Sequence, residues 1–171
     1  AGVALVEHPD VAMVSITGSV TAGKAVARAA ADSLKRVHLE LGGKAPVVVF
    51  DDADVEGVVA NLTEASYYNS GQDCTAPCRI IAGSGVYDDL VARLAEGVSG
   101  IRTGDPTDPE TAMGPLVSSE QRDRVAAMVS RAVDAGAEAV TGATERDGAG
   151  WFYEPTVLAG VAQNSEIAQR E

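Results

Sequence analysis

The chain has 171 residues, of which 46% are apolar and 22% are charged, with a formal net charge of -12 at pH 7. This composition is typical of a globular protein with a real core, and the acidic balance argues against nucleic acid or an anionic membrane surface as partner, because both are bound through basic patches. No apolar run reaches the ~20 residues that span a bilayer, and the first residues lack the layout of a signal peptide. With only two cysteines and therefore no disulfide framework, we expect a protein of the reducing cytoplasm.

The first quarter of the sequence predicts a strand, a glycine-rich turn and a helix in succession. Residues 11–16 form an apolar run that suits a buried strand, and alanines and valines recur at helical spacing up to about residue 33. Between them, Gly18 and Gly23 are spaced as in a phosphate-binding loop, although Ala25 stands where such a loop has Ser or Thr. The turn either presents backbone N–H groups to a phosphate or provides a close helix–sheet contact.

The next two segments predict strands on either side of a glycine pair. Residues 36–41 alternate, so that His38 and Glu40 share one face. Residues 46–50 are apolar throughout, as in a strand covered on both faces. At the end of its strand, Glu40 can face a cleft or can be a solvated residue, and His38 alone is interpreted as structural.

The following helix leads to the first cysteine. Its acidic start at residues 51–54 suits an N-cap and first turn, and helical spacing continues toward residue 67. Cys74 then precedes a strand-like run at residues 78–82. A cysteine in this position can be a partly exposed nucleophile, or it can be a small buried hydrophobe. No Cys or His near Cys74 and Cys78 completes a metal site, so we expect none.

The rest of the chain continues the alternation of helices and strands. The prediction is a helix over 86–101, an exposed loop over 104–115 and a helix opened by Ser118 and stopped by Gly136. A strand over 137–140, a loop over 141–150 and a last strand over 151–158, interrupted by Pro155, follow. This order indicates an α/β protein with mainly parallel sheets and flanking helices.

Four segments in this order resemble the aldehyde dehydrogenase superfamily. They are Thr17-Gly18-Ser19-x-x-x-Gly23, Glu40-Leu41-Gly42-Gly43-Lys44, Gly71-Gln72-x-Cys74 and the final Glu171. The resemblance covers essentially the whole chain. The residues around Cys74 are most similar to the gamma-aminobutyraldehyde and betaine aldehyde dehydrogenase branch. It implies that residues 1–41 are the C-terminal part of a Rossmann-like NAD(P)-binding domain and residues 42–171 the N-terminal part of the catalytic domain, in an internal fragment of a protein that forms homo-oligomers at full length.

The resemblance also implies a reaction and a set of residue roles. An aldehyde is oxidised to the carboxylic acid through a thiohemiacetal and a thioester on Cys74, and Glu40 is the general base that activates water. NAD is the expected cofactor, with NADP as the alternative. The residues implied to contact the cofactor are Gly18, Ser19, Gly23, Leu41 and Glu171.

The sequence leaves alternatives open for the charge of the substrate and for whether the chain takes part in turnover. Asp73, next to the implied nucleophile, either attracts a cationic aldehyde such as 4-aminobutanal or only caps its own turn. The chain is either an enzyme segment or a family-derived domain that binds or assembles without turnover. A relative that reduces an acyl phosphate is a third reading, which Glu40 disfavours because that reaction needs no base to activate water.

Overall fold

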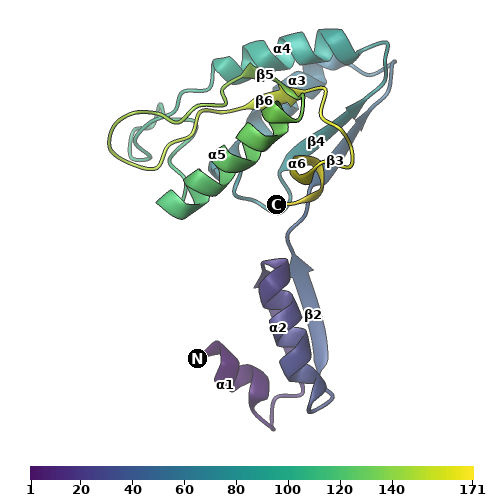
Figure 1. The fold of residues 1–171 in the computed structure, drawn as a ribbon, viewed down its shortest axis with the longest axis vertical. Helices are drawn as coiled ribbons and strands as arrows, with labels where there is room; N and C mark the ends of the chain where they lie inside the picture. The colour runs from purple at the N-terminus through teal and green to yellow at the C-terminus, as the bar shows by residue number, and fades with distance from the viewer. The chain divides into compact units, whose positions relative to one another are not determined.

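The computed structural model describes residues 1–171 and divides them into two compact units, Ala1–Gly43 and Lys44–Glu171. The sequence-based domain boundary lies two residues earlier, and the assignment of the units to a cofactor domain and a catalytic domain stays a prediction. Figure 1 labels the elements of each unit. No helix in the structure combines the length and apolar character that crossing a membrane requires.

The first unit is a strand–helix–strand arrangement preceded by a short helix. Its elements are α1 (Gly2–Glu7), β1 (Met13–Gly18), α2 (Val20–Ala31) and β2 (Arg36–Leu41). β1 and β2 pair in parallel, as expected for strands joined by a helical crossover. The strand–turn–helix–strand order was predicted, whereas α1 was not expected from the sequence.

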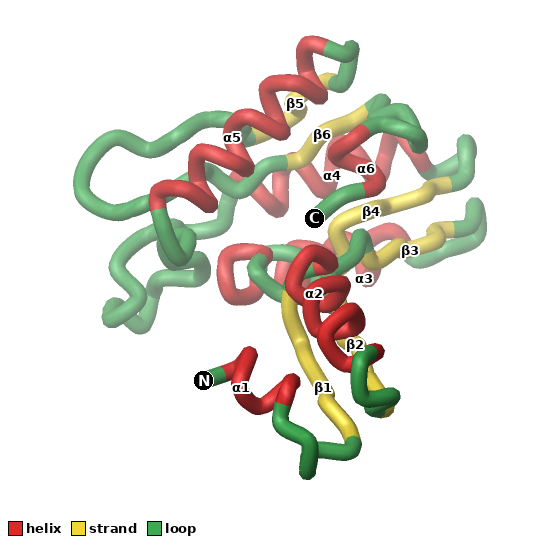
Figure 2. Tube along the Cα trace, turned by 60° about the horizontal axis from the view of Figure 1, so that its bottom comes forward, coloured by secondary structure: helices red, strands yellow, loops and turns green.

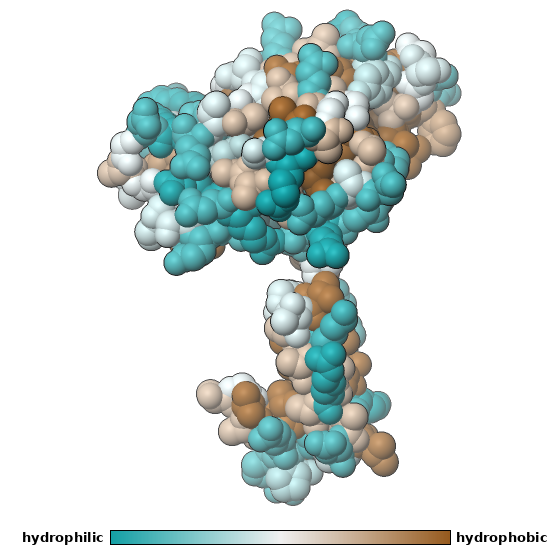
Figure 3. Space-filling model, in the orientation of Figure 1, coloured by the Kyte–Doolittle hydropathy of each residue, from teal (hydrophilic) through white to brown (hydrophobic).

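The two faces of the β1–β2 sheet differ in polarity. Val14, Ile16 and Val37 are partly buried, and Leu41 contacts Gly23 of α2. The alternating positions Ser15 and His38 are exposed on the other face. Figure 3 shows brown hydrophobic residues as well as teal hydrophilic ones on the surface of this unit. The face away from α2 therefore carries the polar side chains of both strands.

The second unit contains two two-stranded sheets. β3 (Ala45–Val49) and β4 (Pro77–Ala82) pair in parallel, and β5 (Glu138–Thr141) and β6 (Val157–Ala159) pair antiparallel. The helical elements are α3 (Val55–Ala65), the 3-10 turn η1 (Tyr68–Gly71), α4 (Tyr87–Ser99), α5 (Ser119–Asp134) and the short α6 (Glu166–Gln169). Figures 1 and 2 both show β5 and β6 between α4 and α5.

The core of this unit is aliphatic, as the low aromatic content predicts. One cluster joins β3 to α4 through Val49 and Leu90. A second cluster, with Leu62 and the fully buried Val98 at its centre, joins α3 to α4. A third joins α5 to the segment before β6. Each burial of a large aliphatic side chain removes apolar surface from water and contributes about 1.5–3 kcal/mol.

Two helix starts in this unit follow from their capping residues. Asp54 caps α3 by accepting a hydrogen bond from the backbone N–H of Gly57 at 3.3 Å. Ser118 caps α5 by accepting from the N–H of Gln121 at 3.2 Å. Both caps were predicted, because a short polar side chain satisfies N–H groups that have no partner inside the helix.

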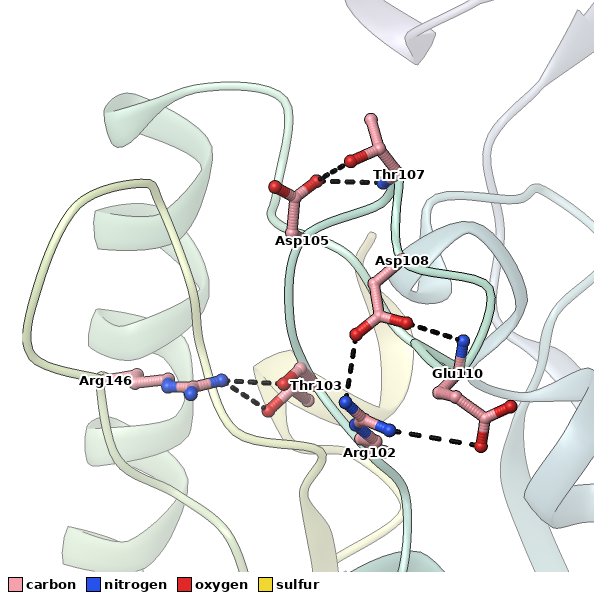
Figure 4. A network of polar contacts seen from close by, with 7 residues as sticks. All are labelled: Arg102, Thr103, Asp105, Thr107, Asp108, Glu110 and Arg146. Carbon is pink, nitrogen blue, oxygen red and sulfur yellow. Dashed lines mark hydrogen bonds and ion pairs between the residues drawn. The ribbon is translucent and has the colours of Figure 1, made fainter.

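The loop between α4 and α5 is held by its own polar groups and by Arg146 from the loop between β5 and β6, as Figure 4 shows. Arg102 Nη2 donates to Asp108 Oδ2 at 2.9 Å, and Arg146 Nη1 donates to the carbonyl oxygen of Thr103 at 2.8 Å. The Gly104 N–H donates to the carbonyl oxygen of Met113 at 3.1 Å, with Met113 buried. The predicted exposed loop is thus an ordered connection that delivers residues 114–117 to a fixed position.

The prediction of a strand over 151–158, interrupted by Pro155, is wrong for the residues before the proline. Only Val157–Ala159 pairs as a strand, and Tyr153 forms an isolated bridge with Glu145. Pro155 has no N–H to give to a ladder. The Thr156 side chain hydrogen-bonds the carbonyl oxygen of Glu154 at 2.7 Å, so this segment satisfies its polar groups locally before the strand begins.

Candidate active site

Cys74 lies on a tight turn between η1 and β4, and its side chain is exposed. The turn closes where the Ala76 N–H donates to the carbonyl oxygen of Asp73 at 3.0 Å. Asp73 Oδ1 accepts from both the N–H and the hydroxyl of Thr75 at 2.9 Å. The Cys74 N–H makes no hydrogen bond within the chain. The turn therefore presents a thiol and a free backbone donor together.

The Asp73 carboxylate caps its own turn, which is one of the two roles that the sequence left open for it. The hydrogen bond from the Thr75 N–H is the main cause that lowers the pKa of Asp73, followed by the Thr75 hydroxyl, and the Cys74 thiol contributes least. Asp73 thus stays charged throughout the neutral pH range. Oδ1 accepts both hydrogen bonds from Thr75, and the Cys74 thiol also interacts with the carboxylate. A second role of this charge toward a substrate stays a prediction.

The residues before the turn adopt left-handed backbone conformations that other parts of the unit hold in place. Asn69 and Ser70 have positive φ, at 49° and 61°, as does Gly71 at 72°. Such angles are costly for residues other than glycine and need compensating contacts. The Ser70 hydroxyl supplies one by donating to the carbonyl oxygen of Gly114 at 2.9 Å.

Gln72 provides a second tie between the cysteine turn and the loop after residue 113. Its Oε1 accepts from the Val117 N–H at 2.9 Å, and its Nε2 donates to the carbonyl oxygen of Asn69 at 3.1 Å. The Gln72 side chain therefore fixes the local backbone and also links it to the segment around Val117. In the motif Gly71-Gln72-x-Cys74, the glutamine has this structural explanation.

The C-terminal end of α3 is tied down as well. The Tyr67 hydroxyl donates to the carbonyl oxygen of Thr156 at 2.9 Å, and the Ser66 hydroxyl donates to that of Pro77 at 2.8 Å. Burial raises the pKa of Tyr67 well above its ordinary value of 10.0. The helix end, β4 and the segment before β6 are thereby joined around the chain that carries Cys74.

Glu40 lies on the polar face of the first unit, near the end of β2. It pairs with Thr17 of β1 in the strand register. Its Oε1 lies 3.1 Å from Nε2 of His38, and Nδ1 of His38 lies 3.1 Å from the Ser15 hydroxyl. The sequence interpretation of His38 as merely structural missed this contact, although alternation had already placed His38 and Glu40 on one face.

The glycine-rich turn joins β1 to α2 in the arrangement expected from the sequence. Ser19 is the N-cap of α2 and accepts a hydrogen bond from the Ala22 N–H at 3.2 Å. A Cβ on Gly23 would lie 2.6 Å from Cδ2 of Leu41, so only glycine permits this helix–strand contact. A Cβ on Gly18 would meet no atom closer than 4.0 Å. The turn thus leaves open space next to Gly18, whereas Gly23 is packed tightly against Leu41.

Within the first unit, the structure brings the predicted cofactor residues together. Gly18 pairs with Leu41 in the register, and Leu41 contacts Gly23, so the predicted cofactor residues of the first unit form one group beside Glu40. Glu171 is exposed and follows α6 in the second unit, which also carries Cys74. No observation here tests the roles of these residues, and they stay predictions.

Comparison with known proteins identifies the family. The aldehyde dehydrogenase family matches the chain over residues 1–171, and the chain belongs to this family. Betaine aldehyde dehydrogenase 1 of Rhizobium meliloti (strain 1021) is 43% identical over 173 residues, covering 99% of this chain and 36% of the relative. Lactaldehyde dehydrogenase of Escherichia coli (strain K12) is 42% identical over 171 residues, covering 99% of this chain and 36% of the relative.

Solved structures give the same family and add a cofactor complex. A lactaldehyde dehydrogenase structure superposes with a TM-score of 0.94 at 42% identity, covering 97% of this chain and 35% of that one. The betaine aldehyde dehydrogenase of Staphylococcus aureus in complex with NAD+ superposes with a TM-score of 0.95 at 34% identity, covering 100% and 35%. The chain thus spans about a third of the length of the relatives it matches.

Proposed function

We propose that this chain is the segment of an NAD(P)-dependent aldehyde dehydrogenase that carries the nucleophile Cys74 and the general base Glu40. The observation that carries the proposal is the match to the aldehyde dehydrogenase family over residues 1–171, together with an exposed thiol on a turn whose preceding residues are anchored to Gly114 and Val117. The term full-length enzyme below denotes this chain together with the residues that flank it in its reading frame.

In the proposed reaction, Cys74 forms the covalent intermediate. The Sγ thiolate adds to the aldehyde carbon, and the carbonyl oxygen becomes the oxyanion of a thiohemiacetal. The free N–H of Cys74 is available to donate a hydrogen bond to that oxyanion. Loss of a hydride from the same carbon converts the thiohemiacetal into a thioester, and the substrate carbon is thereby oxidised.

The glycine-rich turn fits the phosphates of a dinucleotide. α2 has twelve residues and begins at an N-cap serine directly after β1, which directs its first N–H groups outward from the end of the sheet. The open space at Gly18 allows close approach of a phosphate to the backbone. NAD(P)+ bound there would supply the hydride acceptor; Gly18, Ser19 and Gly23 would hold it, with Leu41 and Glu171 as further contacts.

Glu40 completes the turnover in this account. Its carboxylate takes a proton from a water molecule while the water oxygen attacks the thioester carbon. The carbon–sulfur bond then breaks, the carboxylic acid leaves and Cys74 returns to its starting form. Glu40 suits this step because its side chain is exposed and only one of its oxygens, Oε1, is in an ion-pair contact within the chain.

We further propose an aldehyde with a cationic group as the substrate class. The support is the charged carboxylate of Asp73 directly beside Cys74. Relatives named for betaine aldehyde and for lactaldehyde match at 43% and 42% identity. Sequence identity alone thus favours neither a cationic nor a neutral aldehyde, and the local charge carries this part of the proposal.

The two cysteines provide a matched test of the proposed function. Both are exposed and they lie four positions apart in the sequence, Cys74 on the turn and Cys78 on β4. In the full-length enzyme, Cys74→Ala should abolish NAD(P)-dependent oxidation of aldehydes, whereas Cys78→Ala should retain most of it. Equal loss in both variants, or full activity in the Cys74 variant, would overturn the assignment.

A further inference from the structure

Three side chains from two neighbouring strands form a row of polar contacts on the polar face of the first unit: one hydrogen bond and one ion-pair contact. The Ser15 hydroxyl lies 3.1 Å from His38 Nδ1, and His38 Nε2 lies 3.1 Å from Glu40 Oε1. Ser15 and His38 are direct partners in the parallel register, and Glu40 follows His38 by two positions on the same face. The backbone pairing of β1 and β2 therefore sets the row.

The chemistry of the three groups fixes where the protons lie. An ionised carboxylate has no hydrogen of its own, so the ring nitrogen Nε2 of His38, 3.1 Å from Glu40 Oε1, is the one that carries a hydrogen. In the neutral ring Nδ1 is then an acceptor, and the Ser15 hydroxyl donates to it. In the protonated ring Nδ1 donates to the Ser15 oxygen instead. The Ser15 hydroxyl can therefore hydrogen-bond His38 in both states of the ring, and His38 Nε2 carries a hydrogen toward Glu40 in each.

This contact distinguishes the two oxygens of Glu40. A glutamate has three side-chain torsions, and the Glu40 side chain is 63% exposed, so an unheld carboxylate would sample many orientations. No lysine or arginine pairs with Glu40, and His38 is its single ion-pair partner. With Oε1 held, Oε2 is the oxygen left free for a water molecule.

We propose that His38 is a positioning residue for the general base, which holds Glu40 through Oε1 and is itself oriented by Ser15. This inference rests on the proposed function, because it concerns the step in which Glu40 activates water. The competing explanation is an ordinary surface ion pair, since His38 and Glu40 are 54% and 63% exposed. An exposed pair adds little to stability. The two explanations therefore differ in their effect on hydrolysis of the thioester.

The experiment compares three variants of the full-length enzyme. His38→Ala removes the donor, His38→Gln keeps an N–H donor on a side chain of similar reach, and His8→Ala is the control at the other histidine of the chain. For each variant, two rates are measured: NAD(P)H formation in a single turnover, and loss of the acyl group from Cys74 in a chase. The melting temperature is recorded in parallel.

Positioning by His38 predicts a split between the two rates. His38→Ala should slow loss of the acyl group about fivefold, equivalent to ~1 kcal/mol at 1.36 kcal/mol per factor of ten, while single-turnover NAD(P)H formation and melting temperature stay unchanged. His38→Gln should recover most of the rate, and His8→Ala should match the unmodified enzyme.

Two results would overturn the inference while the proposed function stands. One is loss of the acyl group from His38→Ala at the unmodified rate. The other is an equal fall in both rates with a lower melting temperature and no recovery in His38→Gln, which would make His38 structural. Failure of the proposed function looks different, because the unmodified enzyme itself would then form no acyl group on Cys74, and the inference about His38 would fall with it.

Discussion

The side chain of Gln72 accepts a hydrogen bond from the backbone of Val117 at 2.9 Å, across 45 positions of the sequence. The same side chain donates to the carbonyl oxygen of Asn69 at 3.1 Å. Gln72 precedes Cys74 by two positions, so the orientation of the cysteine turn depends on a segment beyond α4. The presence of Gln72 in the cysteine motif is thus explained by its hydrogen bond to the loop that contains Val117.

Replacement of Gln72 should affect both stability and catalysis. Gln72→Ala removes two hydrogen bonds at an exposed site and should lower the free energy of unfolding by about 1 kcal/mol. A shifted turn misplaces the thiol, so kcat/KM should fall by about tenfold or more. Urea unfolding and steady-state kinetics of the full-length enzyme measure the two effects. The exposed Gln163→Ala is the control; an equal response of both variants would remove the special role of Gln72.

Tyr67 should make the protein sensitive to alkaline pH. Burial raises the pKa of this phenol in the folded protein above its ordinary value of 10.0, so the stabilisation is fully present below ~10 and is lost as pH rises beyond it. Tyr67→Phe also loses the hydrogen bond to Thr156, which costs about 0.5–1.5 kcal/mol at neutral pH. The variant should therefore be less stable at neutral pH but should decline less steeply in alkali.

The exposed neighbour Tyr68 serves as the control for this prediction, since its side chain forms no hydrogen bond within the chain. Unfolding free energies are compared between neutral pH and about pH 10.5 for the unmodified protein, Tyr67→Phe and Tyr68→Phe. Identical alkaline slopes for the unmodified protein and Tyr67→Phe would show that another group causes the decline.

Asp73→Asn tests whether the charge next to Cys74 selects the substrate. Asparagine keeps an acceptor oxygen for the N–H and hydroxyl of Thr75, so the turn is retained while the negative charge is removed. The ratio of kcat/KM for 4-aminobutanal to that for butanal should fall about tenfold, or ~1.4 kcal/mol. An unchanged ratio would leave Asp73 with its capping role alone.

The secondary structure near the predicted site followed from local patterns in the sequence. The apolar run before Gly18 and the alternation through Glu40 gave β1 and β2, and the acids before Val55 gave the start of α3. These signals are local, because side-chain alternation and capping depend on residues a few positions apart. The parallel pairing followed from the helix between the two strands.

The features that the sequence did not reveal depend on distant contacts. Ser70 adopts a positive φ of 61° while its hydroxyl reaches the carbonyl oxygen of Gly114, 44 positions away. No local pattern in the sequence indicates that Ser70 and Gly114 are in contact. The placement of His38 on one face with Glu40 followed from the alternation in the sequence. Its contact with Ser15 could not be predicted, because that contact depends on the register of β1 against β2.

The central claim, that Cys74 carries the acyl group and Glu40 removes it, is tested most directly by trapping the thioester. Glu40→Gln in the full-length enzyme should form NAD(P)H in a rapid burst and then turn over slowly, because acylation proceeds and water attack does not. Acid quenching after the burst and fragmentation of the peptide that contains residues 74–78 should locate one acyl group on Cys74 and none on Cys78. An acyl group on Cys78, or a Glu40→Gln variant with the unmodified steady-state rate and no trapped thioester, would contradict the account.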